Sequence, residues 1–202
     1  MKTRFYHVLL AGPVALTWIW TWLYLASEWS ANEQYQYGFA IPLLGLYLGF
    51  QRWPIPLPRG QRSGFILYVA AFPMIFVAEL LRLTDPLWRL TGAAFMTGAT
   101  LLTMGYLGQL AGWMLVRRMI FPLGFLWLGL PWPVPLENLF IQGLSRTIAA
   151  ITTTLLNLGG IAALQRGNTI ETAGQLVGVD GACSGIQSLQ ASLMASLFLW
   201  GA

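Results

Sequence analysis

Cys183 is the only cysteine, and the only thiol nucleophile, in the chain of 202 residues. Gly181 precedes it, Ser184 and Gly185 follow it, and a long apolar run continues to the end of the sequence. We predict that this run is a helix beginning at Cys183 or Ser184. The first N–H groups of a helix lack intrahelical partners and the helix dipole places partial positive charge there, so this position favours thiolate over thiol.

The residues around the cysteine suit acyl transfer. The N–H groups at the helix start, with Ser184, are placed to hold the oxyanion of a tetrahedral intermediate. Gly181 and Gly185 leave room for the backbone of a substrate. A lone cysteine in a membrane helix is also a common small apolar filler. The residues alone therefore leave two interpretations open for Cys183, a nucleophile and a packing residue.

The segment before the cysteine must position it. Residues 166–185 are the least apolar part of the chain. Residues 169–172 and 175–179 alternate or carry β-branched side chains on either side of Ala173 and Gly174, which predicts a short β-hairpin on the membrane surface. Two isolated strands are marginally stable in water, so we expect the hairpin to lean on the helices.

The composition predicts an integral membrane protein. Hydrophobic residues make up 56% of the chain and charged residues 9%, too few polar groups to cover a water-soluble globule of this size. A single cysteine excludes an internal disulfide, and no Cys and His cluster is present for zinc, so we expect no cofactor. The basic residues are scattered between apolar runs, which argues against nucleic-acid binding.

A helix needs about 20 apolar residues to cross a hydrocarbon core ~30 Å thick. The chain is therefore predicted to be all-α, a multipass transmembrane bundle in one domain over residues 1–202, with about six spans. The stretch 139–164 is apolar but carries Gln142, Arg146 and Asn157, which predicts one further helix, either buried among the others or interfacial. The predicted spans are 8–26, 39–50, 64–81, 92–116, 120–132 and a last one from Cys183 or Ser184 onward.

Two side-chain patterns predict how these helices pack. In the last helix Ser184, Ser188, Ser192 and Ser196 recur every four residues, and small hydroxyl residues let helices approach closely in lipid. We therefore expect the serine face to pack against the bundle. Glu79 and Arg82 stand three residues apart on one helix face and are expected to pair.

The basic residues predict the orientation. They mark alternate loops, whereas the loop after the first span carries Glu28 and Glu33 without a positive charge. The amino terminus is therefore expected to be cytoplasmic, in the inner (plasma) membrane. The segment with Asp85 has net positive charge on the expected outer side and is the exception. The residues that mark the cytoplasmic side are Lys2, Arg4, Arg52, Arg59, Arg62, Arg117 and Arg118.

Four segments together resemble the exosortase and archaeosortase family of multipass membrane cysteine transpeptidases. They are "YGFAIPLLGLYLGFQR" (37–52), "FPLGFLWLGLPWPVPLENL" (121–139), "RGNTI" (166–170) and "ACSGIQSLQASLMASL" (182–197). The resemblance implies that Cys183 is the nucleophile and lies on the extracytoplasmic side. It also implies cleavage of C-terminal sorting signals, of the PEP-CTERM kind, on exported proteins that are linked to exopolysaccharide and biofilm. The implied partners are these exported proteins and the lipid bilayer.

The chain departs from the family pattern after the cysteine. The family pairs its cysteine with an arginine and a histidine on later segments, and the sequence has neither residue type in the 19 residues that follow Cys183. We therefore expect a truncated, weakly active or inactive form that lacks the C-terminal segments. His7, Arg146 and Arg166 are the remaining candidates for the missing partners, and an inert role is expected for each. The alternative is a non-enzymatic multipass protein, such as a lipid or polysaccharide carrier or an assembly subunit.

Overall fold

The computed structural model describes residues 2–54, 64–85, 88–173, 175–178 and 186–202. It divides into two compact units, one of Met1–Pro131 with Met194–Ala202 and one of Trp132–Leu193. Most described residues are helical, as predicted, and the strands form one small sheet.

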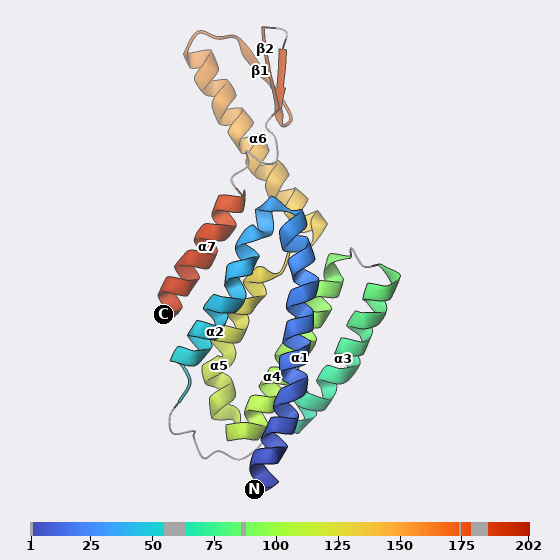
Figure 1. Ribbon diagram of the computed structural model, residues 1–202. Helices are drawn as coiled ribbons and strands as arrows, with labels where there is room; N and C mark the ends of the chain where they lie inside the picture. The colour runs from blue at the N-terminus through green and yellow to red at the C-terminus, as the bar shows by residue number, and fades with distance from the viewer. Residues whose placement is uncertain (1, 55–63, 86–87, 174, 179–185) are drawn as a thin grey trace. The chain divides into compact units, whose positions relative to one another are not determined.

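The first unit is a bundle of helices that run up and down in sequence order (Figure 1). Gly112, with φ of +79°, ends one helix and the next begins directly at Trp113, because glycine adopts this left-handed conformation without a steric penalty. The elements are α1 (Lys2–Ala31), the 3-10 helix η1 (Glu33–Ala40), α2 (Ile41–Gln51), α3 (Phe65–Thr84), α4 (Arg89–Ala111), α5 (Trp113–Leu126) and the 3-10 helix η2 (Trp127–Gly129).

The break at Gly112 corrects the predicted boundaries. The sequence predicts one span over 92–116 followed by a loop with Arg117 and Arg118, but both arginines lie in the first turns of α5. The predicted span 39–50, with Tyr35 and Tyr37 ahead of it, is divided between η1 and α2. Periodicity did not reveal these breaks because the apolar runs continue across them.

Four described helices are long and apolar enough to cross a membrane: Leu9–Ala31 of α1, α3, α4 and α6 (Val134–Leu158). The first three correspond to predicted spans. The fourth is the stretch that the sequence left as buried or interfacial. Helices α2, α5 and α7 (Ile186–Gly201), with 11, 14 and 16 residues, are each shorter than the ~30 Å core at ~1.5 Å per residue.

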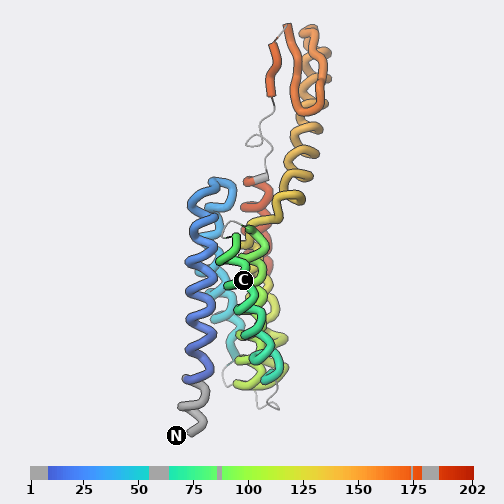
Figure 2. Tube along the Cα trace, turned by 90° about the vertical axis from the view of Figure 1, so that its right-hand side faces the viewer, coloured from blue at the N-terminus to red at the C-terminus, as the bar shows by residue number. Residues whose placement is uncertain are grey.

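Several basic residues of the first unit lie near one end of its helices. The end of α2, the start of α3 and the turn from α4 to α5 lie at one end of the unit in both views (Figure 1 and Figure 2). Arg52, Arg117 and Arg118 belong to these ends. At the opposite end Arg82 and Glu79 pair as predicted, with Arg82 Nε 3.0 Å from each carboxylate oxygen.

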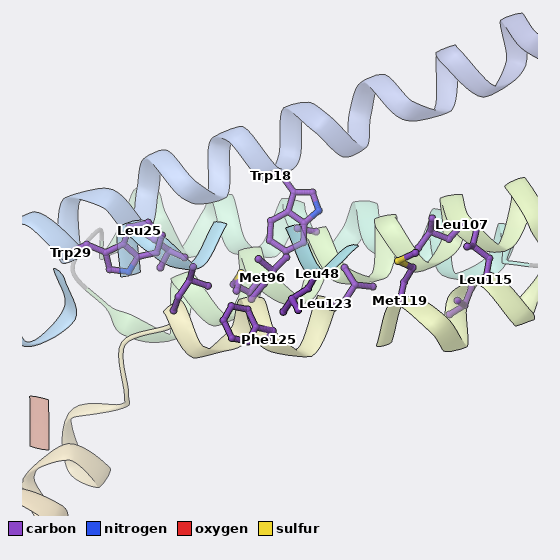
Figure 3. Close-up of a cluster of buried hydrophobic side chains, with 14 of the residues drawn as sticks. Trp18, Leu25, Trp29, Leu48, Met96, Leu107, Leu115, Met119, Leu123 and Phe125 are labelled. Atoms are coloured by element: carbon purple, nitrogen blue, oxygen red, sulfur yellow. The ribbon is translucent and has the colours of Figure 1, made fainter. Parts of the chain in front are cut away.

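The core of the first unit is aromatic and aliphatic (Figure 3). Trp18, Trp29 and Tyr35 are buried in it together with Leu48 and Leu115. Buried polar hydrogen bonds fix the large rings: Trp18 Nε1 donates to Thr103 Oγ1 at 2.8 Å, and Trp29 Nε1 donates to the Gly129 carbonyl at 2.8 Å. The indole donors are satisfied, as burial of a tryptophan requires.

Glycines set the spacing of α3 and α4. A Cβ built at Gly105 would lie 2.4 Å from the backbone nitrogen of Tyr68, and one at Gly98 would lie 2.6 Å from the side chain of Ile75. The two helix backbones therefore touch at these positions, which is the close approach that small residues permit in membrane bundles.

The second unit contains α6 and a three-stranded antiparallel sheet. Pro133 and Pro135 flank the start of α6, where a missing N–H costs nothing. The strands are β1 (Ala163–Arg166), β2 (Thr169–Thr172) and β3 (Gln175–Gly178), in the order β1-β2-β3. The predicted hairpin is β2 with β3. The sequence missed β1 because Ala163 and Leu164 continue the apolar run of the preceding helix.

The last turns of α7 correct the predicted packing of that helix. Within Met194–Ala202 the face that joins the core carries Met194, Leu197 and Phe198, while Ser196 is exposed. Phe198 lies 6.2 Å from the Phe125 ring centroid to centroid. Aromatic packing, not the serine face, therefore holds this part of the helix.

Candidate active site

The cysteine motif lies outside the described residues. Cys183, Ser184, Gly181 and Gly185 fall between the end of β3 at Gly178 and the described part of α7, and so does Asp180. The predicted start of the last helix and its N–H groups therefore stay predictions. What the structure describes is the segment that leads to the motif.

The sheet is tied to α6 through Asn157. Its side-chain amide donates to the Ala163 carbonyl at 3.0 Å, and its side-chain oxygen accepts from the Ala163 N–H at 2.9 Å. Gly160, with φ of +82°, makes the turn between helix and strand. A second tie comes from Gln165, whose Nε2 donates to the carbonyls of Arg146 and Gly167, each at 3.0 Å. These bonds fix the direction of β1 along the helix.

The pairing of β2 with β3 extends the sheet that is tied to α6. Ile170 of β2 is buried and faces Val177 of β3. All of β3 is exposed. Cys183 follows the last residue of β3 by five positions in the sequence. The sheet is thus the described element nearest in sequence before the cysteine.

The charged residues in the second unit are placed as follows. Arg166 Nε lies 2.8 Å from Glu171 Oε2 across the β1–β2 pair, and both side chains are accessible, at 65% and 36%. Arg146 is exposed on α6. Arg166 thus has a protein partner in Glu171, which the sequence did not predict. His7 is in α1, and its side chain is outside what the structure describes.

Glu137 is a carboxylate that the sequence did not single out. It lies in the first turn of α6, directly after the Pro-Trp-Pro segment, and is 6% exposed. An acidic residue in the first turn of a helix is favoured by the dipole. The helix predicted from the sequence began only at Leu139, whereas α6 begins at Val134 and includes Glu137.

The turn that precedes α6 is anchored in the first unit by two aromatic residues. Tyr37 Oη donates to the Leu128 carbonyl at 3.3 Å, and Trp29 binds the next carbonyl, that of Gly129. Both carbonyls belong to η2, which ends just before the Pro-Trp-Pro segment. The first and second resembling segments, 37–52 and 121–139, therefore meet in space.

No group of three or more His, Cys, Asp or Glu side chains that would hold a metal ion occurs among the described residues. In comparisons with known proteins, the sequence profile of the family described as transmembrane exosortase matches residues 29–200. No curated protein and no solved structure matches the chain. The matched range contains the aromatic anchors, the sheet and the cysteine motif.

Proposed function

Because the chain belongs to the transmembrane exosortase family, we propose that it is a cysteine transpeptidase that cleaves the C-terminal sorting signals of exported proteins. Its membrane spans make it a multipass membrane protein. The observation that carries the proposal is the family match over 29–200, which includes the only cysteine of the chain. The proposed substrates are exported proteins with PEP-CTERM-like signals.

Cys183 is the proposed nucleophile. Its thiolate attacks the carbonyl carbon of the scissile amide, and the N–H groups at the helix start, with Ser184, stabilise the oxyanion. The C–N bond then breaks, the leaving amine takes up a proton, and a thioester remains on the sulfur. An acceptor nucleophile attacks this thioester, releases the thiolate and takes the acyl group. Gly181 and Gly185 give the substrate backbone access.

We propose that the cysteine faces the extracytoplasmic side, where α6, although long enough to cross the membrane, does not return the chain to the cytoplasm, and that the amino terminus is cytoplasmic. The grouping of Arg52, Arg117 and Arg118 at one end of the first unit supports the second part, since basic residues favour the cytoplasmic side. An exported substrate reaches an extracytoplasmic cysteine after translocation, while its own membrane helix is still in the bilayer.

The test is a cleavage assay with the complete product of the gene in membranes and a reporter that carries a sorting signal. Cys183→Ala is expected to abolish cleavage and to leave the amount of folded protein unchanged. Ser188→Ala, at an exposed position of α7, is the matched control and is expected to cleave normally. Normal cleavage by Cys183→Ala would favour the non-enzymatic alternative.

A further inference from the structure

The first unit contains an apolar groove that the proposed reaction does not use. Its volume is about 650 Å³, and helices α1, α2, α4 and α5 all contribute to its walls. Gly49 of α2 leaves it open, because a Cβ built there would meet only Pro122, at 4.0 Å. Trp18, Trp22, Phe50 and Leu123 are among the other lining residues.

The walls of the groove are almost entirely apolar. Thr103 and Trp18 are the polar side chains that meet at the wall, and they hydrogen-bond to each other at 2.8 Å. Figure 3 shows the Trp18 ring directed from α1 into the cluster. Since Thr103 and Trp18 are paired with each other and most other lining side chains are apolar, a polar occupant would lose hydrogen bonds to water and replace few of them. The groove therefore suits an alkyl chain.

The volume of the groove can be compared with the volumes of two apolar occupants, a transmembrane helix and an acyl chain. A transmembrane helix about 30 Å long and about 10 Å wide has a volume of roughly 2,400 Å³, several times that of the groove. A methylene group occupies about as much space as a water molecule in the liquid, ~30 Å³, so the groove has room for roughly 20 of them. One acyl chain of a phospholipid has room in the groove, whereas a transmembrane helix could place only part of its surface there.

Positive charge lies one helical turn from this groove. Arg118 is four residues before Pro122 on α5, about 6 Å along the helix axis. Arg117 and Arg118, with Trp113 and Met114, line a second cavity of about 500 Å³. Both arginines are exposed, and neither forms an ion pair within the part of the chain that the structure describes. Trp113 suits the headgroup level of a bilayer.

We propose that this groove binds one acyl chain of an anionic glycerophospholipid from the surrounding bilayer, with its phosphate held by Arg117 and Arg118. The bilayer interior is as apolar as the groove, so the chain alone gives little preference over other lipids. The arginines provide that preference, because basic residues next to membrane helices attract anionic headgroups. The site is independent of Cys183 and of the proposed reaction.

The test uses the full chain in phosphatidylcholine vesicles that contain phosphatidylglycerol with a photoactivatable group on one acyl chain. After illumination, mass spectrometry of peptides locates the attached lipid. We expect attachment at groove residues such as Trp22 and Phe50. Attachment spread evenly over the outer surfaces of the bundle would overturn the proposal, and so would attachment that a sorting-signal helix peptide displaces.

Two glycine variants test the groove itself. Gly49→Leu fills the groove. We expect it to lower attachment of the lipid about tenfold, because most of the binding site is lost. Gly124→Leu on α5 is the matched control, because Gly124 is exposed, has open space around its Cα and does not line the groove. Equal attachment in both variants would contradict the proposal. Mapping of the wild-type site keeps the test decisive if Gly49→Leu fails to fold.

The arginine variants test the headgroup. In wild type, photoactivatable phosphatidylglycerol is expected to attach more than the phosphatidylcholine analogue. Arg117→Gln and Arg118→Gln are each expected to reduce this preference about fivefold, the effect of one basic residue at a membrane surface. Equal attachment of the two lipids to the wild-type protein would rule out a site selective for anionic lipids.

Discussion

Arg166 is the basic residue closest in sequence before the cysteine, and its ion pair defines what it does in the structure. Its partner Glu171 lies across the sheet, and both side chains are accessible to solvent. Exposed ion pairs contribute about 0–1 kcal/mol to stability. We expect Arg166→Gln and Glu171→Gln to change the free energy of unfolding equally and by less than about 1 kcal/mol.

Denaturant titration in detergent measures this small loss, and the cleavage assay gives a second readout. The two variants are expected to cleave alike, because each breaks the same pair. A loss of cleavage in Arg166→Gln alone would mean that the guanidinium meets the substrate, in place of the inert role predicted for it.

Trp29 is the residue on which the turn before α6 depends. Its indole N–H is buried and satisfied by the Gly129 carbonyl. Trp29→Phe leaves that buried carbonyl without its donor, which costs about 1–3 kcal/mol. We expect a matching fall in the free energy of unfolding, measured by denaturant titration. Trp200→Phe, at a position 77% exposed, is expected to change it little, and an equal loss in both would contradict the anchor.

At the scale of elements, the contact between α3 and α4 depends on the absence of a side chain at Gly105. Gly105→Ala places a methyl group against the backbone of Tyr68, where no side chain can yield. We expect the helix pair to separate locally and the protein to lose at least about 1–3 kcal/mol, the usual cost of overpacking. Gly124→Ala, with nothing within 4 Å of the added atom, is the control.

Thermal unfolding followed by circular dichroism in detergent compares these two variants. Gly105→Ala is expected to unfold at a lower temperature than wild type, and Gly124→Ala at the same temperature or higher, because alanine favours a helix over glycine. An unchanged midpoint in Gly105→Ala would show that α3 and α4 are not in close contact.

Some of the helices and strands could be predicted from the sequence, and others could not. Periodicity and composition located α1, α3 and α4 and the β2–β3 hairpin, because each is bounded by polar or turn residues. They missed the break at Gly112 and the strand β1, where the apolar character of the chain does not change. The packing face of α7 was predicted wrongly because the stripe of serines is a local pattern, whereas the contact of Phe198 with Phe125 depends on residues far apart in the sequence.

For the whole molecule, the proposed topology predicts which residues a reagent outside the cell can reach. Cys183 is expected to react with a membrane-impermeant thiol reagent added to intact cells, since we propose that it faces the extracytoplasmic side. A cysteine introduced as Arg117→Cys in the Cys183→Ala background is expected to react only after the membrane is permeabilised. Mass shift of the labelled protein measures both. Labelling of the introduced cysteine from outside, together with no labelling of Cys183 in the wild-type protein, would reverse the proposed topology.

The proposed reaction requires that Cys183 carry the acyl group of the cleaved substrate. The most direct measurement is the intact mass of the complete gene product after a short incubation with a sorting-signal peptide, followed by acid quenching. We expect the mass of the protein to rise by that of the acyl fragment. The added mass should lie on the peptide that contains Cys183, and hydroxylamine should remove it. Cleavage of the peptide with no such adduct, or an adduct that persists in Cys183→Ala, would contradict the claim.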